Sequence, residues 1–174
     1  IGKSNDIYSE QIISILRKRF KFLEIFFCKN KKCKPNKKIL NWKGDIIFSF
    51  RSFFILNQNF INKAKVCAIN FHPGPPSYRG IGCVNFALLN NEKNYGCTAH
   101  LIDKKIDSGK ILNYKVFKIS KNSSVDQVLQ KTYKIQVKQA NNIVEKLIKK
   151  DFMVKELFKN KKWSKKLYTR KELD

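Results

Sequence analysis

Two side chains suited to acyl transfer stand two positions apart near the middle of the chain. Asn70 lies near the end of a short apolar segment, residues 66–71, which is predicted to form a buried strand, and His72 directly follows this segment. Because side chains alternate along an extended strand, both point to the same side of it. An amide can donate a hydrogen bond to a developing oxyanion, and an imidazole can donate or shuttle a proton. A capped strand end with a satisfied surface histidine is the structural alternative for the same residues.

A second polar segment, residues 102–111, lies between two predicted strands and carries two carboxylates, Asp103 and Asp107. Gly109 allows the chain to turn tightly there. Asp107 is suited to orient the histidine or to accept a proton through water, although an Asx-turn or a capping role accounts for such an aspartate equally well. His100, the only other histidine, lies in the preceding strand. We interpret it as a core residue, with a place in the site as the alternative.

The elements that must position these residues alternate between strands and helices. Three prolines directly after His72 end its strand, because proline cannot continue a sheet. This alternation predicts an α/β fold with a Rossmann-like, mostly parallel sheet, helices on both faces and sites at the carboxyl ends of strands. The predicted strands are residues 21–28, 45–50, 66–71, 96–102 and 111–119. The predicted helices are residues 9–18, 82–90 and 125–149, the last with Ser123 or Ser124 as its N-cap.

The length of 174 residues suits one α/β domain with a buried core. Residues 1–150 are expected to form this domain, with Ile1 and Gly2 as the remainder of a truncated first strand. Residues 151–174 are expected to be a basic C-terminal extension in which Trp163 and Tyr168 are isolated anchors. The chain does not begin with Met, so it is expected to be a fragment or a trimmed protein.

The cysteines and apolar segments favour a reduced, cytoplasmic protein. The five cysteines are unevenly spaced and include no CxxC pair, which is typical of free thiols rather than a disulfide framework. With only two histidines in addition, no metal site is expected. No apolar run has the roughly 18 to 20 residues of a membrane span, and the first residues show no signal-peptide pattern. A membrane is therefore not an expected partner.

The formal charge of +24 comes mostly from lysines that are spread along the whole chain. A dedicated RNA groove would bring arginines and a localised stripe, and arginine is sparse here. We interpret the excess as a general compositional bias that also attracts anionic small molecules. No specific nucleic-acid partner is expected, although a non-catalytic basic module that binds nucleic acid remains an alternative.

Two blocks of the sequence resemble the signature of the 10-formyltetrahydrofolate-dependent formyltransferase family. The first is residues 69–82 (INFHPGPPSYRGIG), and the second combines residues 95–102 (YGCTAHLI) with residues 105–112 (KIDSGKIL). Their order and separation also fit, and the resemblance covers roughly the first 147 residues. It implies that 10-formyltetrahydrofolate is the formyl donor. It also implies the catalytic residues, which are Asn70, His72 and Asp107.

The resemblance also suggests residues that bind the two substrates. The segment of residues 45–56 is similar to the one whose backbone lines the pteridine pocket of the folate. The expected cofactor-binding residues are Phe50, Phe53, Ile55 and Asp103. The expected substrate-binding residues are Pro75, Tyr78 and Arg79. For Arg79, a contact with an anion and a structural salt bridge remain equal alternatives.

Within the family, the chain most resembles the nucleotide-sugar N-formyltransferases. The segments that carry this likeness are residues 73–76 (PGPP), 85–88 (NFAL) and 168–173 (YTRKEL). Members that act on methionyl-tRNA usually show a Ser-Leu-Leu-Pro type segment after the histidine. The resemblance implies formylation of a nucleotide-linked amino sugar for polysaccharide biosynthesis, with methionyl-tRNA or another amine, such as a purine precursor, as the alternative acceptor. It implies small-molecule partners and leaves a homodimer open.

Overall fold

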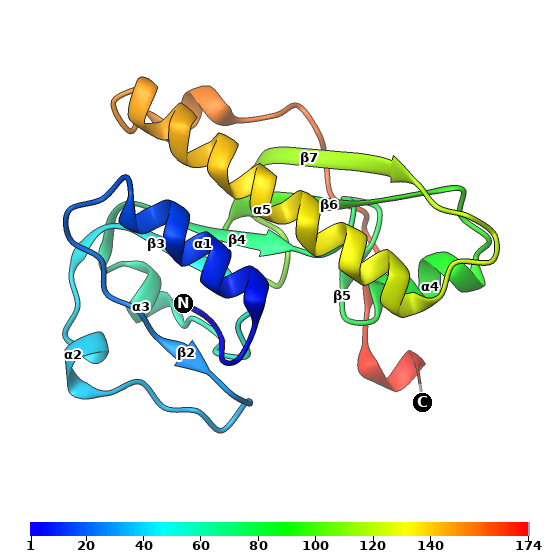
Figure 1. Cartoon of the computed structure of the whole chain (residues 1–174), viewed down its shortest axis with the longest axis horizontal. Helices are drawn as coiled ribbons and strands as arrows, with labels where there is room; N and C mark the ends of the chain where they lie inside the picture. Colours follow the sequence, from blue (N-terminus) through cyan, green and yellow to red (C-terminus); the bar gives the residue numbers. More distant parts are fainter. Residues whose placement is uncertain (174) are drawn as a thin grey trace.

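A four-stranded sheet with helices on both of its faces forms the centre of the fold (Figure 1). The computed structural model describes residues 1–173. In this sheet β3 and β4 are parallel, whereas β4 and β6, and β6 and β7, are antiparallel. The strand order is β3-β4-β6-β7, and the strands are Gly44–Phe50, Ala64–His72, Asn94–Leu101 and Ile111–Lys118.

Two pairs of short parallel strands accompany the central sheet. β1 (Gly2–Lys3) pairs with β2 (Phe27–Cys28), and β5 (Arg79–Gly80) pairs with β8 (Leu167–Tyr168). The predicted α/β fold is confirmed. Among the described strands, the parallel pairings are β1–β2, β3–β4 and β5–β8, and the antiparallel ones both involve β6. The alternation of elements alone does not predict that β6 runs against β4.

The strand predicted over residues 21–28 is wrong for residues 21–26. Only Phe27–Cys28 is paired, because β1 provides partners for two residues and no more. Phe22, in the unpaired part, is 85% exposed. The backbone amide of Phe50 donates to the carbonyl of Ile1 at 2.9 Å, which joins the β1–β2 pair to the edge of β3.

Helices α1 (Ile7–Arg17) and α5 (Val125–Lys149) cover one face of the sheet (Figure 1). The bounds of α5 agree with the prediction, and its N-cap is Ser124. The Ser124 hydroxyl accepts from the Gln127 amide, and the Gln127 side chain accepts from the Ser124 amide. Such a capping box satisfies backbone donors that have no partner inside the helix. It accounts for the sharp start of α5 after a polar turn.

Shorter helices lie on the opposite face and beyond the end of β4. α2 (Lys37–Leu40) and α3 (Gln58–Ile61) contribute Ile39 and Phe60 to a second core cluster, which also contains Ile47 and Ala68 of the sheet. α4 (Cys83–Leu89) follows the proline-rich turn after β4. Within residues 1–173, no helix has the length and apolar character that crossing a bilayer requires.

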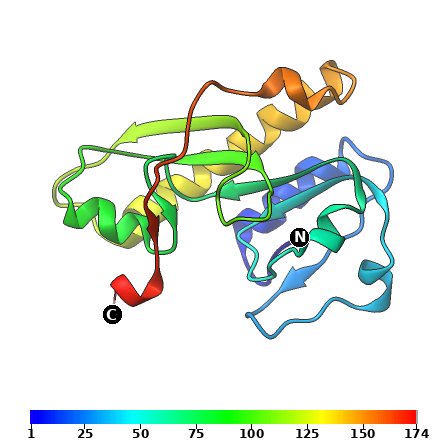
Figure 2. The same ribbon diagram turned by 180° about the vertical axis from the view of Figure 1, so that it is seen from behind.

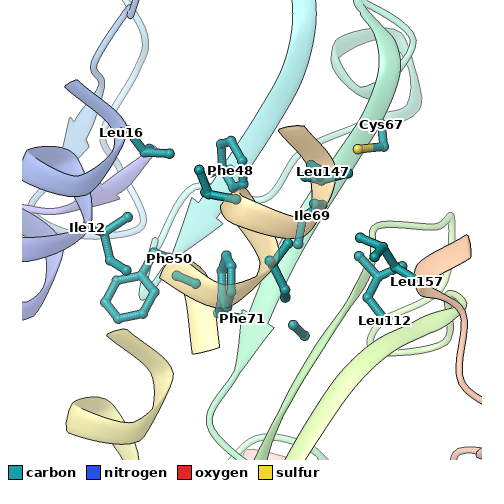
Figure 3. Close-up of a cluster of buried hydrophobic side chains, with 14 of the residues drawn as sticks. Ile12, Leu16, Phe48, Phe50, Cys67, Ile69, Phe71, Leu112, Leu147 and Leu157 are labelled. Atoms are coloured by element: carbon teal, nitrogen blue, oxygen red, sulfur yellow. The ribbon is translucent and has the colours of Figure 1, made fainter. Parts of the chain in front are cut away.

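The main core fixes which way the polar residues of β4 point. Phe48 and Phe50 of β3 and Ile69 and Phe71 of β4 point toward α1 and α5 (Figure 3). Phe50 and Phe71 pack edge to face with ring centroids 5.9 Å apart. Since successive side chains alternate between faces, Asn70 must point to the face away from α5, as must the residues two positions away from it.

The C-terminal segment, expected to be an extension, packs on the domain in the structure. Figure 2 shows it crossing the face of the sheet opposite α5. Leu157 is buried in the main core, within the 3-10 helix Val154–Leu157, and Tyr168 is buried in a cluster with Tyr78 and Val84. The amide of Lys159 donates to the carbonyl of Ile111 at 2.8 Å. A second 3-10 helix, Arg170–Glu172, follows β8.

The burial pattern predicts that two leucines in helices contribute very differently to the free energy of unfolding. Leu147 of α5 is 0% exposed in the main core, and Leu89 at the end of α4 is 72% exposed. We expect Leu147→Ala to lower the free energy of unfolding by about 2–5 kcal/mol, because a buried cavity is created. Leu89→Ala should change it by less than about 0.5 kcal/mol. Urea unfolding of both variants measures this, and equal losses would contradict the placement of α5.

Candidate active site

Four polar side chains meet on the face of the sheet that points away from α5. Asn70 and His72 come from the end of β4, and His100 comes from β6, whose antiparallel register places it directly opposite Asn70. Asp107 comes from the loop between β6 and β7. The two histidines are 3% exposed and Asp107 is 9% exposed. Asn70, which is partly buried, and Asp107 are 37 positions apart in the sequence, and the fold brings them into one polar group.

The carboxylate of Asp107 lies between the two imidazoles. Its Oδ2 is 3.2 Å from Nδ1 of His72, and its Oδ1 is 3.4 Å from Nε2 of His100. Nδ2 of Asn70 is 3.2 Å from the same His100 nitrogen. The amide of Gly80 donates to Asp107 Oδ2 at 2.9 Å. Asn70, His100, Asp107 and His72 therefore form one continuous polar chain.

The remaining ring nitrogen of His72 faces a backbone oxygen. Its Nε2 is 2.7 Å from the carbonyl of Tyr78, so this nitrogen carries a proton and donates it to the carbonyl. The thiol of Cys83 lies 3.7 Å from the same nitrogen. Burial lowers the pKa of His72 below its ordinary value, while Asp107 and the Tyr78 carbonyl offset part of this change.

Burial by itself would raise the pKa of Asp107. The hydrogen bond with His100, the charges of the two histidines and the Gly80 amide outweigh burial and lower this pKa to about 2. The lowered pKa of Asp107 and the lowered pKa of His72 oppose each other. A charged imidazole would favour the ionised carboxylate, whereas burial disfavours a charge on His72. We adopt the ionised carboxylate, because the Gly80 amide donates to it at any pH. The backbone of Asp107 has a φ of 44°, a left-handed conformation that is unfavourable for most residues with a side chain.

The residues predicted to bind the folate are spread over two loops and the core. The side chain of Phe50 is buried against Phe71, and its backbone amide donates to the carbonyl of Ile1. Phe53 and Ile55 lie in the segment after β3 and are 38% and 80% exposed. Asp103 is exposed and accepts from the amide of Lys104. Their contact with a cofactor stays a prediction.

The residues predicted to bind the acceptor form the wall beside His72. The ring of Tyr78 stacks on Tyr168 at 5.2 Å, and its hydroxyl donates to Glu92 at 2.9 Å. Pro75 is buried in the same turn and accepts from the Tyr78 amide. Arg79 donates to two backbone carbonyls, those of Ser164 and Ile106, at 3.1 and 2.8 Å. These contacts are structural, and binding of a substrate by these residues stays a prediction.

Two residues of the site have only weak signals in the sequence. The sequence favours His100 as a core residue, with the site as the alternative. Alternation along β6 assigns it to the face of Asn70 only once the register with β4 is known. Trp163 lies in the lysine-rich tail, yet its ring is 5.6 Å from that of His72 and 5.0 Å from that of His100, centroid to centroid. Its indole nitrogen donates to the carbonyl of Gly109 at 2.8 Å. No pattern in the sequence connects this tryptophan to the histidines.

Comparison with curated proteins identifies relatives that are much longer than this chain. Bifunctional polymyxin resistance protein ArnA of Wigglesworthia glossinidia brevipalpis is 38% identical over 90 residues, which is 51% of this chain and 14% of that protein. Methionyl-tRNA formyltransferase of Azobacteroides pseudotrichonymphae genomovar. CFP2 is 30% identical over 120 residues, 65% of this chain and 36% of the relative. The chain therefore corresponds to a part of each of these proteins.

Solved structures share the fold over nearly the whole chain. WlaRD, a sugar 3N-formyl transferase crystallised with dTDP and 5-N-formyl-THF, superposes with a TM-score of 0.71 at 22% identity, covering 99% of this chain and 69% of that one. The N-formyltransferase from Helicobacter canadensis, in complex with folinic acid and dTDP-3-aminofucose, gives a TM-score of 0.70 at 21% identity, with 99% and 70% covered.

The family follows from a match over the central part of the sequence. A family model described as Formyl transferase matches residues 29–147. This range is more than half of the chain, and it contains β3, β4, β6 and the group formed by Asn70, His72, His100 and Asp107. The chain thus belongs to the formyl transferase family.

Proposed function

We propose that the protein transfers a formyl group from 10-formyltetrahydrofolate to the amino group of a nucleotide-linked amino sugar. The observation that carries the proposal is the buried contact of Asp107 with His72, beside Asn70 on the same face of the sheet. An amide donor, an imidazole and a carboxylate in contact are the groups that amine formylation requires. The likeness to two enzymes crystallised with formyl-folates and dTDP or a dTDP-sugar supports the choice of both substrates.

In the proposed reaction, the acceptor amine attacks the formyl carbon on N10 of the folate. The carbonyl oxygen becomes an oxyanion, which Asn70 and His72 stabilise by donating hydrogen bonds. His72 carries the necessary proton on Nε2, where the Tyr78 carbonyl now accepts it. Asp107 Oδ2 lies 3.2 Å from the other ring nitrogen, and the carboxylate helps to remove the proton of the amine, directly or through water. Collapse of the intermediate then breaks the bond to N10, which takes up a proton, and releases tetrahydrofolate.

Methionyl-tRNA is the second candidate acceptor, and two observations favour it. A methionyl-tRNA formyltransferase is 30% identical over 120 residues, and a formal charge of +24 attracts polyanions in general. The tail and the PGPP turn favour a sugar instead. We place the reaction in the cytoplasm, in agreement with the free state of all five cysteines.

The role of the amide and imidazole predicts a loss of turnover without unfolding. We expect Asn70→Ala and His72→Ala each to lower kcat by about 10²- to 10³-fold, because one oxyanion donor is lost. Asn142→Ala is a matched control, since Asn142 is exposed on α5. Formyl transfer from 10-formyltetrahydrofolate to a panel of nucleotide-linked amino sugars measures kcat, and thermal unfolding monitors the fold. Parallel losses of stability and activity would favour a purely structural role.

The contact between His72 and Asp107 predicts the direction of a pKa change. Burial lowers the pKa of His72, and the charge of Asp107 raises it in part. The imidazole should therefore titrate below its ordinary value of about 6.5, and Asp107→Asn should lower its midpoint further by removing the favourable charge. The chain has two histidines, so NMR titration resolves both rings. A higher midpoint in Asp107→Asn would show that the carboxylate does not face His72.

The dispersed charge predicts weak binding of RNA that disappears with salt. Lysines spread over the whole chain attract any polyanion by counterion release, and the sequence does not concentrate them in one segment. We expect tRNA binding to be lost at about 150 mM salt, where exposed charges are largely screened. A salt titration of tRNA binding tests this. Submicromolar binding at that salt, together with formylation of methionyl-tRNA, would replace the sugar by the tRNA acceptor.

A further inference from the structure

The segment of residues 159–168, here called the strap, places Trp163 against the two histidines of the site. Trp163 of the strap forms T-shaped contacts with His72 and His100, at interplanar angles of 72° and 86°. Its indole nitrogen donates to the carbonyl of Gly109, two residues after Asp107. One side chain therefore contacts both imidazoles and the loop of the carboxylate.

The strap is fastened on both sides of Trp163. The amide of Ser164 donates to the carbonyl of Pro76 at 2.9 Å, and the amide of Lys159 donates to that of Ile111. Beyond Ser164, the strap pairs in parallel with Arg79 and Gly80 as strand β8. Because hydrogen bonds hold the backbone before and after it, the indole ring has a defined place over the site.

The loop that carries Asp107 needs support, and the strap provides it. Asp107 adopts a left-handed φ of 44°, a conformation that persists only where its surroundings hold it. The carbonyl of Ile106, just before it, accepts from Arg79, whose other terminal nitrogen donates to Ser164 of the strap. The carbonyl of Gly109, just after it, accepts from Trp163. The turn is thus clamped on both sides of the strained residue.

We propose that Trp163 is a positioning residue of this site, which fixes His72 and His100 against Asp107. Its ring keeps the imidazoles in place and excludes water, and its indole N–H holds the turn that presents the carboxylate. Trp163 takes part in no proton transfer. The inference rests on the proposed function only for its effect on the rate, because the orientation and titration of the imidazoles can be measured without any substrate.

The test separates the two contributions of the indole. Trp163→Phe retains an aromatic ring and loses the N–H donated to Gly109, whereas Trp163→Ala loses both. Lys162→Ala is the matched control, because Lys162 is exposed on the same strap. We expect kcat to fall about 10- to 100-fold in Trp163→Ala, since misplaced catalytic groups cost factors of this order. Trp163→Phe should fall between this variant and the wild type, and KM for the formyl donor should change less than kcat.

NMR of the two histidine rings supplies the second readout. In Trp163→Ala the His72 ring becomes more exposed. Burial is the largest cause of its lowered pKa and outweighs the charge of Asp107, so its titration midpoint should move up toward the ordinary value of about 6.5. The ionisable groups around His72, namely Asp107, His100, Arg79 and Cys83, are unchanged in this variant. Lys162→Ala should leave the His72 midpoint where it is.

The outcomes distinguish this inference from the proposed function. A wild-type His72 midpoint in Trp163→Ala, measured on folded protein, would overturn the positioning role whether or not the enzyme is active. Unchanged kcat in this variant would overturn it as well. If Trp163→Ala fails to fold, Trp163→Phe decides by the same two measurements. If the wild type transfers no formyl group while the midpoints shift as expected, the proposed function fails and the positioning of the imidazoles by Trp163 stands.

Discussion

A single buried carboxylate is the constraint on which the rest of the site depends. Asp107 is 9% exposed, and a buried charge without partners carries a cost of several kcal/mol, by order of magnitude. Its partners are the imidazoles of His72 and His100 and the amide of Gly80, which belong to β4, β6 and β5. The carboxylate is therefore accommodated only when three separate elements have reached their final places, so the site forms together with the fold.

Local patterns predict those parts of the fold whose cause is local. The 25 residues of α5 have an amphipathic pattern and a capping serine, and both act within the helix itself. Apolar runs likewise mark the four strands of the central sheet, and alternation along β4 places Asn70 and His72 on one side. Its residue type and loop make Asp107 a candidate from the sequence, but only the family resemblance connects it with Asn70 and His72, because no local rule links residues so far apart in the sequence.

The remaining features depend on contacts that a local pattern does not contain. The direction of β6 follows from the path of the chain through the proline-rich turn and α4, and only this direction places His100 opposite Asn70. Residues 21–26 are apolar enough for a strand, but the short β1 reaches only the carbonyl of Phe26, which accepts from the Gly2 amide. Trp163 is a lone aromatic residue among lysines, and its importance lies in partners that are 54 or more positions away.

The hydrogen bond from His72 to the carbonyl of Tyr78 bears on how such a site discriminates between ground state and transition state. In the resting protein this carbonyl occupies the donor that the proposed reaction needs. A neutral formyl oxygen that replaces it exchanges one uncharged acceptor for another and gains little. A negatively charged oxygen gains more, because hydrogen bonds to charged acceptors are roughly twice as strong. The backbone carbonyl thus competes with the substrate oxygen for the same donor. Only the charged oxygen of the transition state displaces it favourably, so this hydrogen bond stabilises the transition state more than the ground state.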